Sequence, residues 1–180
     1  MRWLKTALVV IVLLLLGQWV VAQEKATLAQ QFYVLKLFNP KLKKVGVITS
    51  VENTEKIKET LTRACLINGL KAIYVEANGL HQLGDAINSL VQDEEIGFLW
   101  IPPNDPIVST EVAMKYILKK AVLKGVPTCV PDKKWLNFGG TLYVGIENGK
   151  VRPYFNTRLV EALGMKVPEK YTHFATAEAE

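Results

Sequence analysis

The stretch Val45-Gly-Val-Ile-Thr-Ser50, together with the residues that follow it as far as Ala64, decides the fold. Residues 45–50 are short, apolar and rich in β-branched side chains, which is typical of a buried parallel strand. A polar loop is expected over 51–54. Apolar residues then recur at helical spacing at Ile57, Leu61 and Ala64. Strand, polar loop and amphipathic helix form the opening half of a βαβ unit, so the sequence predicts an open α/β sheet.

The same alternation continues along the chain. Further apolar runs predict strands over 70–75, 96–101, 126–130 and 141–145, with amphipathic helices between the first four strands. The acidic patch over 92–95 is expected in a loop, because acids at a helix C-terminus oppose the helix dipole. Asn148-Gly149 predicts a hairpin turn before a short edge strand over 151–154, and Asn156 predicts the cap of a last helix. We therefore expect a flavodoxin-like, three-layer α/β/α domain with a mostly parallel sheet of about five strands.

The N-terminal segment, residues 1–22, is expected to direct export. It has a basic start, an apolar run over 6–16 and small residues before Gln23, as in a secretory signal peptide. The alternative is an uncleaved anchor in the inner membrane, although the apolar run is short for a spanning helix. Residues 23–43 are expected to form a lead with a helix that packs on the sheet edge. Residues 44–171 form the single α/β lobe and 172–180 a disordered tail.

Composition excludes several classes of protein. The formal charge is +5, but Arg2 and Lys5 lie in the signal segment, and the remaining lysines are scattered rather than interleaved with aromatic residues. We therefore expect no nucleic-acid partner. Cys65 and Cys129 fit either two small buried hydrophobes or a disulfide. With two histidines in the chain, no metal-ligand spacing and no paired carboxylates, we expect no cofactor, no metal and no catalysis.

Several polar residues are expected to lie where a ligand would bind. In open α/β sheets, ligands bind beyond the carboxyl ends of the strands. Ser50, Asn53 and Thr54 follow the first strand, and Asp105 follows the third strand between prolines. Each has two interpretations. Asn53 and Thr54 also suit a helix N-cap, and Asp105 also suits a turn, so ligand contact and local structure both remain open.

Several segments, in order, resemble one family. Residues 45–48, 99–107, 125–127 and above all 156–168 (Asn-Thr-Arg-Leu-Val-Glu-Ala-Leu-Gly-Met-Lys-Val-Pro) are similar to ABC-transporter substrate-binding proteins of the type I periplasmic-binding class. The resemblance covers about residues 38–171. Such proteins have two Rossmann-like lobes that close on a small solute and deliver it to a membrane permease. The resemblance thus implies a periplasmic protein of solute transport.

The resemblance also implies site residues. Asn104 and Asp105 match the acidic ligand loop after the third strand, and one extra residue leaves open which of them corresponds. Ser50, Asn53 and Thr54 match the first-strand loop, and Asp132 matches the loop after the fourth strand.

The chain has room for one lobe, which is half of a cleft. We therefore expect a non-catalytic protein that binds a small, polar, amino-acid-like solute at the carboxyl ends of the strands. A second copy in a homodimer would supply the other half, and an ABC permease would be the partner. The alternative is an exported scaffold or sensor module that binds a protein partner, with Trp135 and Phe138 as the contact face.

Overall fold

The computed structural model describes residues 25–174 of the 180-residue chain. The segment predicted to be a signal peptide or anchor, residues 1–22, lies outside these residues. Most of the predicted tail lies outside them as well. Its first three residues, 172–174, instead form the end of a 3₁₀ helix, η4 (Glu169–Phe174).

A six-stranded sheet forms the centre of the molecule, with the strand order β2-β1-β3-β4-β5-β6. The first five strands run parallel to their neighbours, and β6 pairs antiparallel with β5. The strands are β1 (Lys44–Thr49), β2 (Lys71–Glu76), β3 (Phe98–Trp100), β4 (Thr128–Cys129), β5 (Leu142–Glu147) and β6 (Lys150–Phe155). The predicted fold class, a mostly parallel α/β sheet, is confirmed.

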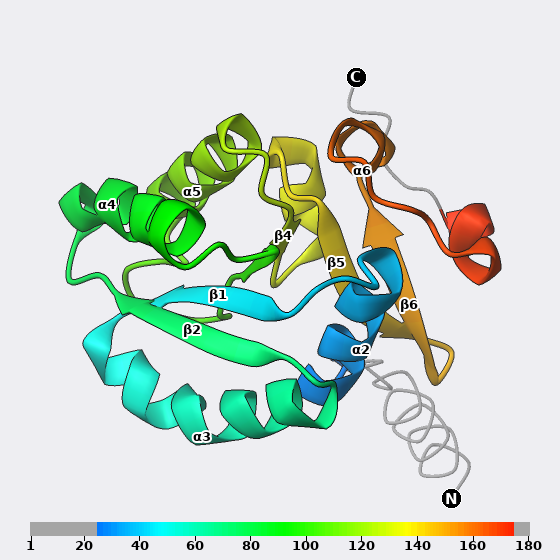
Figure 1. The fold of residues 1–180 in the computed structure, drawn as a ribbon, viewed down its shortest axis with the longest axis horizontal. Helices are drawn as coiled ribbons and strands as arrows, with labels where there is room; N and C mark the ends of the chain where they lie inside the picture. Colours follow the sequence, from blue (N-terminus) through cyan, green and yellow to red (C-terminus); the bar gives the residue numbers. More distant parts are fainter. Residues whose placement is uncertain (1–24, 175–180) are drawn as a thin grey trace, which may run out of the picture.

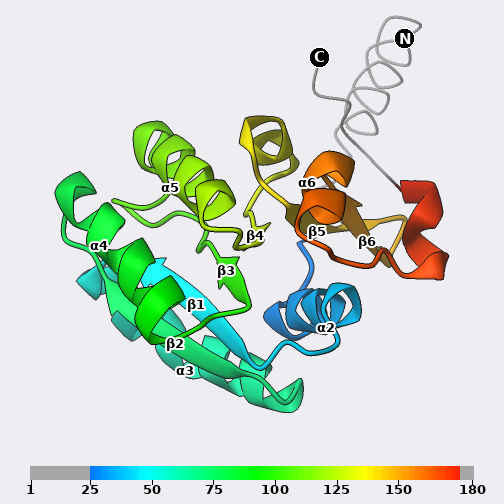
Figure 2. The same ribbon diagram turned by 45° about the horizontal axis from the view of Figure 1, so that its top comes forward.

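Helices cover both faces of this sheet, which gives three layers (Figure 1). The helix α3 (Val51–Ile67) lies on one side of β1 and β2, and α4 (Leu83–Asn88) and α5 (Glu111–Leu123) lie on the other. Figure 2 shows the same separation from a second direction. Short helical turns complete the chain: η1 (Leu80–Gln82), η2 (Ser89–Asp93), η3 (Lys133–Phe138) and α6 (Thr157–Ala162).

Two hydrophobic cores follow from this layering. In β3, Phe98 and Trp100 join the core under α3, whereas Leu99 joins the core under α4 and α5. Side chains of a strand alternate between the two faces of a sheet, and here both faces are covered. This is why the strands read as continuous apolar runs in the sequence.

The helix α2 (Leu28–Phe38) packs on a face of the sheet, where the sequence predicted packing on its edge. Phe32 contacts Trp100 edge-on at 6.2 Å between ring centroids, and Phe38 contacts Phe155 at 5.4 Å. Both phenylalanines are fully buried in the core that α3 also covers. A stripe of large aromatic side chains needs more apolar area than an edge strand offers, so the helix covers the face beside α3.

Two local predictions were wrong at helix boundaries. Residues 51–54 are the first turn of α3 and not a loop, because Ser50 caps the helix directly. The acidic patch was expected in a loop from residue 92, but η2 continues the helical path to Asp93 as a π turn, in which Glu94 N–H donates to the Ser89 carbonyl at 3.1 Å. The chain leaves this turn at Glu95, which has a φ of 53°.

The strand order places the candidate site. The chain moves from β1 to β2 on one side and then returns to place β3 on the other side of β1. The segments that leave β1 and β3 therefore diverge at the carboxyl edge of the sheet, which is the position where open α/β sheets bind their ligands.

Candidate functional site at the carboxyl edge of the sheet

The start of α3 is fixed by a capping side chain. Ser50 has an extended backbone, with φ −70° and ψ 156°, and its Oγ accepts a hydrogen bond from Asn53 N–H at 3.3 Å. Serine is among the best residues for this position, because its oxygen satisfies an N–H that has no partner within the helix. Thr54 is buried and donates its hydroxyl to the Ser50 carbonyl at 2.9 Å. Local hydrogen bonds therefore account for both residues: Ser50 caps the helix, and Thr54 bonds back to the Ser50 carbonyl.

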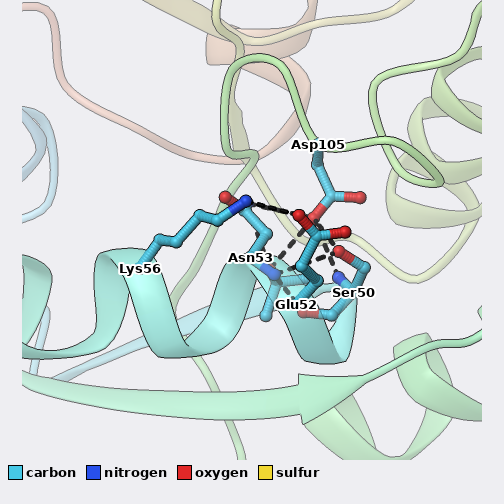
Figure 3. Close-up of polar contacts among 6 residues, drawn as sticks. Ser50, Glu52, Asn53, Lys56 and Asp105 are labelled. Carbon is cyan, nitrogen blue, oxygen red and sulfur yellow. Dashed lines mark hydrogen bonds and ion pairs between the residues drawn. The ribbon is translucent and has the colours of Figure 1, made fainter.

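Asp105 crosses from the loop after β3 to this helix start (Figure 3). Its Oδ2 accepts hydrogen bonds from Ser50 N–H at 2.8 Å, Asn53 Nδ2 at 3.0 Å, Thr49 Oγ1 at 3.0 Å and Ser50 Oγ at 3.1 Å. Its Oδ1 accepts from the N–H groups of Ile107 at 2.9 Å and Val108 at 2.8 Å. We call these residues, with Asp105 at the centre, the Asp105 cluster.

Hydrogen bonding overcomes burial in setting the ionisation of Asp105. Its side chain is 2% exposed, and burial alone raises the pKa of a carboxyl group. The backbone N–H groups of Val108, Ser50 and Ile107, with the Thr49 hydroxyl, nevertheless hold the pKa of Asp105 below its ordinary value. The charged carboxylate is therefore the stable form at neutral pH, held by the positive end of the α3 dipole.

The prediction that Ser50, Asn53 and Asp105 lie together at the edge of the sheet agrees with these contacts. Contact of these three residues, and of Thr54, with a ligand stays a prediction. The Asp105 carboxylate faces α3 and is directed into the protein by six hydrogen bonds, which indicates a structural role in joining the loop after β3 to the start of α3.

An apolar hollow opens beside this cluster. It has a volume of about 260 Å³ and lies beyond the carboxyl ends of β3 and β4, against the first residues of β5, where α2 and α3 also reach it. Aromatic and aliphatic side chains form most of its wall, among them Trp100, Ile101, Val130, Tyr143, Val144 and Ile57. Trp100 is held in place by its Nε1–H, which donates to Gln31 Oε1 at 2.8 Å.

A polar hollow of about 180 Å³ adjoins it, and the two share Lys25, Pro103 and Pro131. Two predicted site residues, Asn104 and Asp132, line this second hollow. Both are exposed, in contrast to Asp105. The positive φ of Asn104, 59°, is a conformation that asparagine tolerates better than most residues. Of these two neighbouring residues, Asn104 lines the hollow, whereas Asp105 turns toward α3.

Asp132 combines a local role with an open position. Its Oδ1 accepts a hydrogen bond from Lys134 N–H at 2.9 Å and caps η3. Its carboxylate also acts on Tyr143 of the apolar hollow, because burial raises the pKa of the Tyr143 hydroxyl and the negative charge of Asp132 raises it further. Asp132 thus lines the polar hollow, and its charge also acts on a residue of the apolar hollow.

Sequence reasoning missed several residues of these hollows, among them Lys25, Trp100 and Tyr143. Lys25 reaches the edge because its backbone forms an isolated antiparallel bridge with Gly145 of β5. A pairing of residues this far apart leaves no local pattern in the sequence. Trp100 and Tyr143 were assigned to strands, and an apolar run does not show which of its residues also reach the edge of the sheet.

Other chemistry is sparse in the part of the chain that the structure describes. Cys65 and Cys129 are buried and unpaired, and burial raises the pKa of each thiol to about 12. Among residues 25–174, no group of His, Cys, Asp and Glu is arranged to hold a metal ion. No helix in this range has the length and apolar character needed to cross a membrane.

Three solved structures share this fold. An ABC domain from Streptococcus pneumoniae in complex with L-Trp has a TM-score of 0.69 and 15% identity, over 82% of this chain and 59% of that chain. A conserved domain protein from Vibrio cholerae has a TM-score of 0.70 and 17% identity, over 85% and 60%. The ligand-free, open structure of CD0873, a substrate-binding protein with adhesive properties from Clostridium difficile, has a TM-score of 0.67 and 20% identity, over 84% and 60%.

The chain thus shares its fold with these structures, one of which is a substrate-binding protein, and the resemblance predicted from the sequence is confirmed at the level of the fold. The chain spans about 60% of the length of these structures. No protein-family model and no curated protein matches the sequence.

Proposed function

We propose that the chain is an exported, non-catalytic solute-binding protein of ABC-transporter type. The solute is small and amino-acid-like, and it binds at the carboxyl edge of the sheet. The observation that carries the proposal is the pair of adjoining hollows at this edge, in a fold shared with substrate-binding proteins. One of these proteins holds L-Trp. Export and the periplasmic location rest on residues 1–22, as either a cleaved signal peptide or an inner-membrane anchor.

Each hollow suits a different part of an amino acid. The apolar hollow, with Trp100 and Tyr143, suits an aliphatic or aromatic side chain. In the polar hollow, the ammonium groups of Lys25 and Lys134 suit a carboxylate, and the Asp132 carboxylate suits an amine. The Asn104 amide can donate or accept. We assign solute contact first to Asn104 and Asp132, and we assign the Asp105 cluster the task of fixing the loop that carries Asn104.

A second surface is needed to enclose the solute. Ligand pockets usually have volumes of about 300–1,000 Å³, and each hollow is smaller. In two-lobed proteins of this kind, hinge closure brings two lobes together around the ligand. We propose that a second copy, in a homodimer, supplies the opposite wall here, and that an ABC permease receives the solute.

The test is a thermal-shift screen of the full chain against each standard amino acid, with the mass in solution measured by light scattering. A ligand that binds only the folded state raises the melting temperature. We expect one or a few apolar amino acids to raise it and to increase the dimer fraction. Melting temperatures that no amino acid changes would contradict the proposal.

One observation favours the alternative, an exported scaffold or sensor module that binds a protein. Phe138 is 49% exposed beside Trp135, with 5.6 Å between their ring centroids. Trp135 itself is buried, so the aromatic contact face is narrower than the sequence predicted. A screen without any responding solute would favour this alternative.

A further inference from the structure

The helix α5 has two apolar stripes, although one stripe is enough to hold it on the sheet. The inner stripe is buried in the core and consists of Ala113, Met114, Ile117, Leu118 and Ala121. The outer stripe consists of Val112, Tyr116 and Leu123, which are 67%, 38% and 70% exposed. Their spacings of four and seven residues align them along one side of the helix. None of these three residues belongs to either buried core.

Lysines surround this outer stripe. Lys119 lies within it, Lys115 flanks one side, and Lys120 and Lys124 flank the other. The neighbouring turn η3, drawn in yellow beside α5 in Figure 2, adds Lys133, Lys134 and the exposed Phe138. Lys115 Nζ lies 4.9 Å from the centre of the Phe138 ring and joins the two elements. We call this the α5–η3 surface.

Positive charge is in excess on this surface. Its six lysines face one acid on α5, Glu111, which is paired with Lys115, and the η3 cap Asp132. The helix α3 on the other face of the sheet is a natural comparison. It carries three acids and three bases, namely Glu52, Glu55, Glu59, Lys56, Lys58 and Arg63. Long-range attraction to a negatively charged surface is therefore expected on the α5 side and not on the α3 side.

We infer that the α5–η3 surface docks on an anionic phospholipid bilayer. An exposed apolar stripe bordered by lysines is the pattern of helices that lie in the membrane interface, where apolar side chains enter the headgroup layer and lysines meet anionic lipids. The course of the chain supports this partner. Lys25 lies with Lys134 and Trp135 around the polar hollow, so the 24 residues before Lys25 join the domain beside η3. Those residues include the apolar run over 6–16. Docking of this surface goes beyond solute binding.

The test places a fluorescent probe on each face of the full chain. Val112→Cys labels the α5–η3 surface, and Leu66→Cys labels α3 at a matched exposure, 67% against 68%. The native thiols are buried, with pKa values of about 12, and stay unlabelled. The labelled proteins are mixed with vesicles of phosphatidylglycerol and phosphatidylcholine that contain a lipid with a quencher at the headgroup. We expect quenching at position 112 to exceed that at position 66 by about fivefold, and to fall in vesicles of phosphatidylcholine alone.

A charge variant separates docking from general proximity to the vesicle. Replacing Lys119, Lys120 and Lys124 by Gln should reduce the quenching at position 112 to the level at position 66, as should about 0.5 M salt, which screens surface charges. Replacing Lys56, Lys58 and Arg63 by Gln removes the same charge from α3 and should change nothing. Equal quenching at both positions in the anionic vesicles would overturn the inference. So would an excess at position 112 that survives the α5 substitutions. Neither readout depends on a solute.

Discussion

The Asp105 cluster and the two open hollows lie at the same edge of the sheet but use similar residues in opposite ways. Asp105 and Asp132 each follow a strand and adjoin a proline. Asp105 is buried and accepts six hydrogen bonds from within the protein. Asp132 is exposed, caps η3 through one oxygen and lines a hollow. An aspartate at a strand end is therefore either held inside the protein by hydrogen bonds or left open to a hollow, according to which way its loop turns.

The largest expected effect comes from disrupting the buried Asp105 cluster. In Asp105→Asn, an NH₂ group replaces an oxygen that now accepts hydrogen bonds, so two donors face each other in a buried site. We expect a loss of about 3 kcal/mol in the free energy of unfolding, measured in urea. For a domain of this size, this corresponds to a fall in melting temperature of about 10 °C.

The matched control is Asp132→Asn. Asparagine caps helices as well as aspartate does, so this variant should stay within about 0.5 kcal/mol of the natural protein. Equal stability losses in the two variants would contradict the distinction between the buried Asp105 cluster and the open hollows.

The proposed role of the two hollows is tested by measuring solute binding. Asp132→Asn removes a charge that faces the polar hollow, and we expect it to weaken solute binding about tenfold in calorimetric titration, with the fold intact. Asp85→Asn, at an exposed position on α4, is the control for charge alone and should bind normally. Unchanged affinity in Asp132→Asn would exclude Asp132 from the site.

A smaller effect on stability is expected at Ser50, which lies at the border of the Asp105 cluster. Ser50→Ala removes the α3 cap and one of the four bonds to Asp105 Oδ2, but leaves Ser50 N–H as a donor at the same position. We expect a loss of about 1 kcal/mol, with solute affinity unchanged. A large fall in affinity, at a stability close to that of the natural protein, would mean that Ser50 contacts the solute.

The smallest effect is a dependence on pH. The pKa of Asp105 is lower in the folded protein than in the unfolded chain, where it is about 4. Its contribution to stability is therefore complete above about pH 5 and is lost as the pH falls through the folded-state pKa. The stability gap between the natural protein and Asp105→Asn should narrow in urea unfolding below about pH 4. A gap that stays constant would show that the charge of Asp105 does not matter.

Much of the fold was predictable because its pattern is local. The alternation of apolar runs and amphipathic stretches predicted the strands, and Asn148-Gly149 predicted the hairpin, in which both residues have positive φ. The capping role of Asn156 was also predictable and is confirmed. The π turn at η2 and the direct cap by Ser50 were missed, since both depend on how the chain enters or leaves a helix, where sequence patterns are weakest.

The site was predictable in its position but not in its orientation. The rule for open α/β sheets placed Ser50, Asn53 and Asp105 at one edge, and they meet there. The sequence did not show that Asp105 turns inward while its neighbour Asn104 turns outward. That difference depends on hydrogen bonds from Thr49 and Ser50, more than fifty residues away along the chain. The place of Lys25 depends in the same way on pairing with Gly145.

The most direct test of this account is an amide NMR spectrum of the full chain, titrated with the amino acid that the thermal-shift screen identifies. We expect the signals of Asn104, Asp132 and Lys134 to move with solute concentration, while those of Ser50, Asn53 and Val108 stay in place. The largest shifts at Ser50, Asn53 and Val108 would contradict it, because the solute would then bind at the start of α3 and displace the contacts of Asp105.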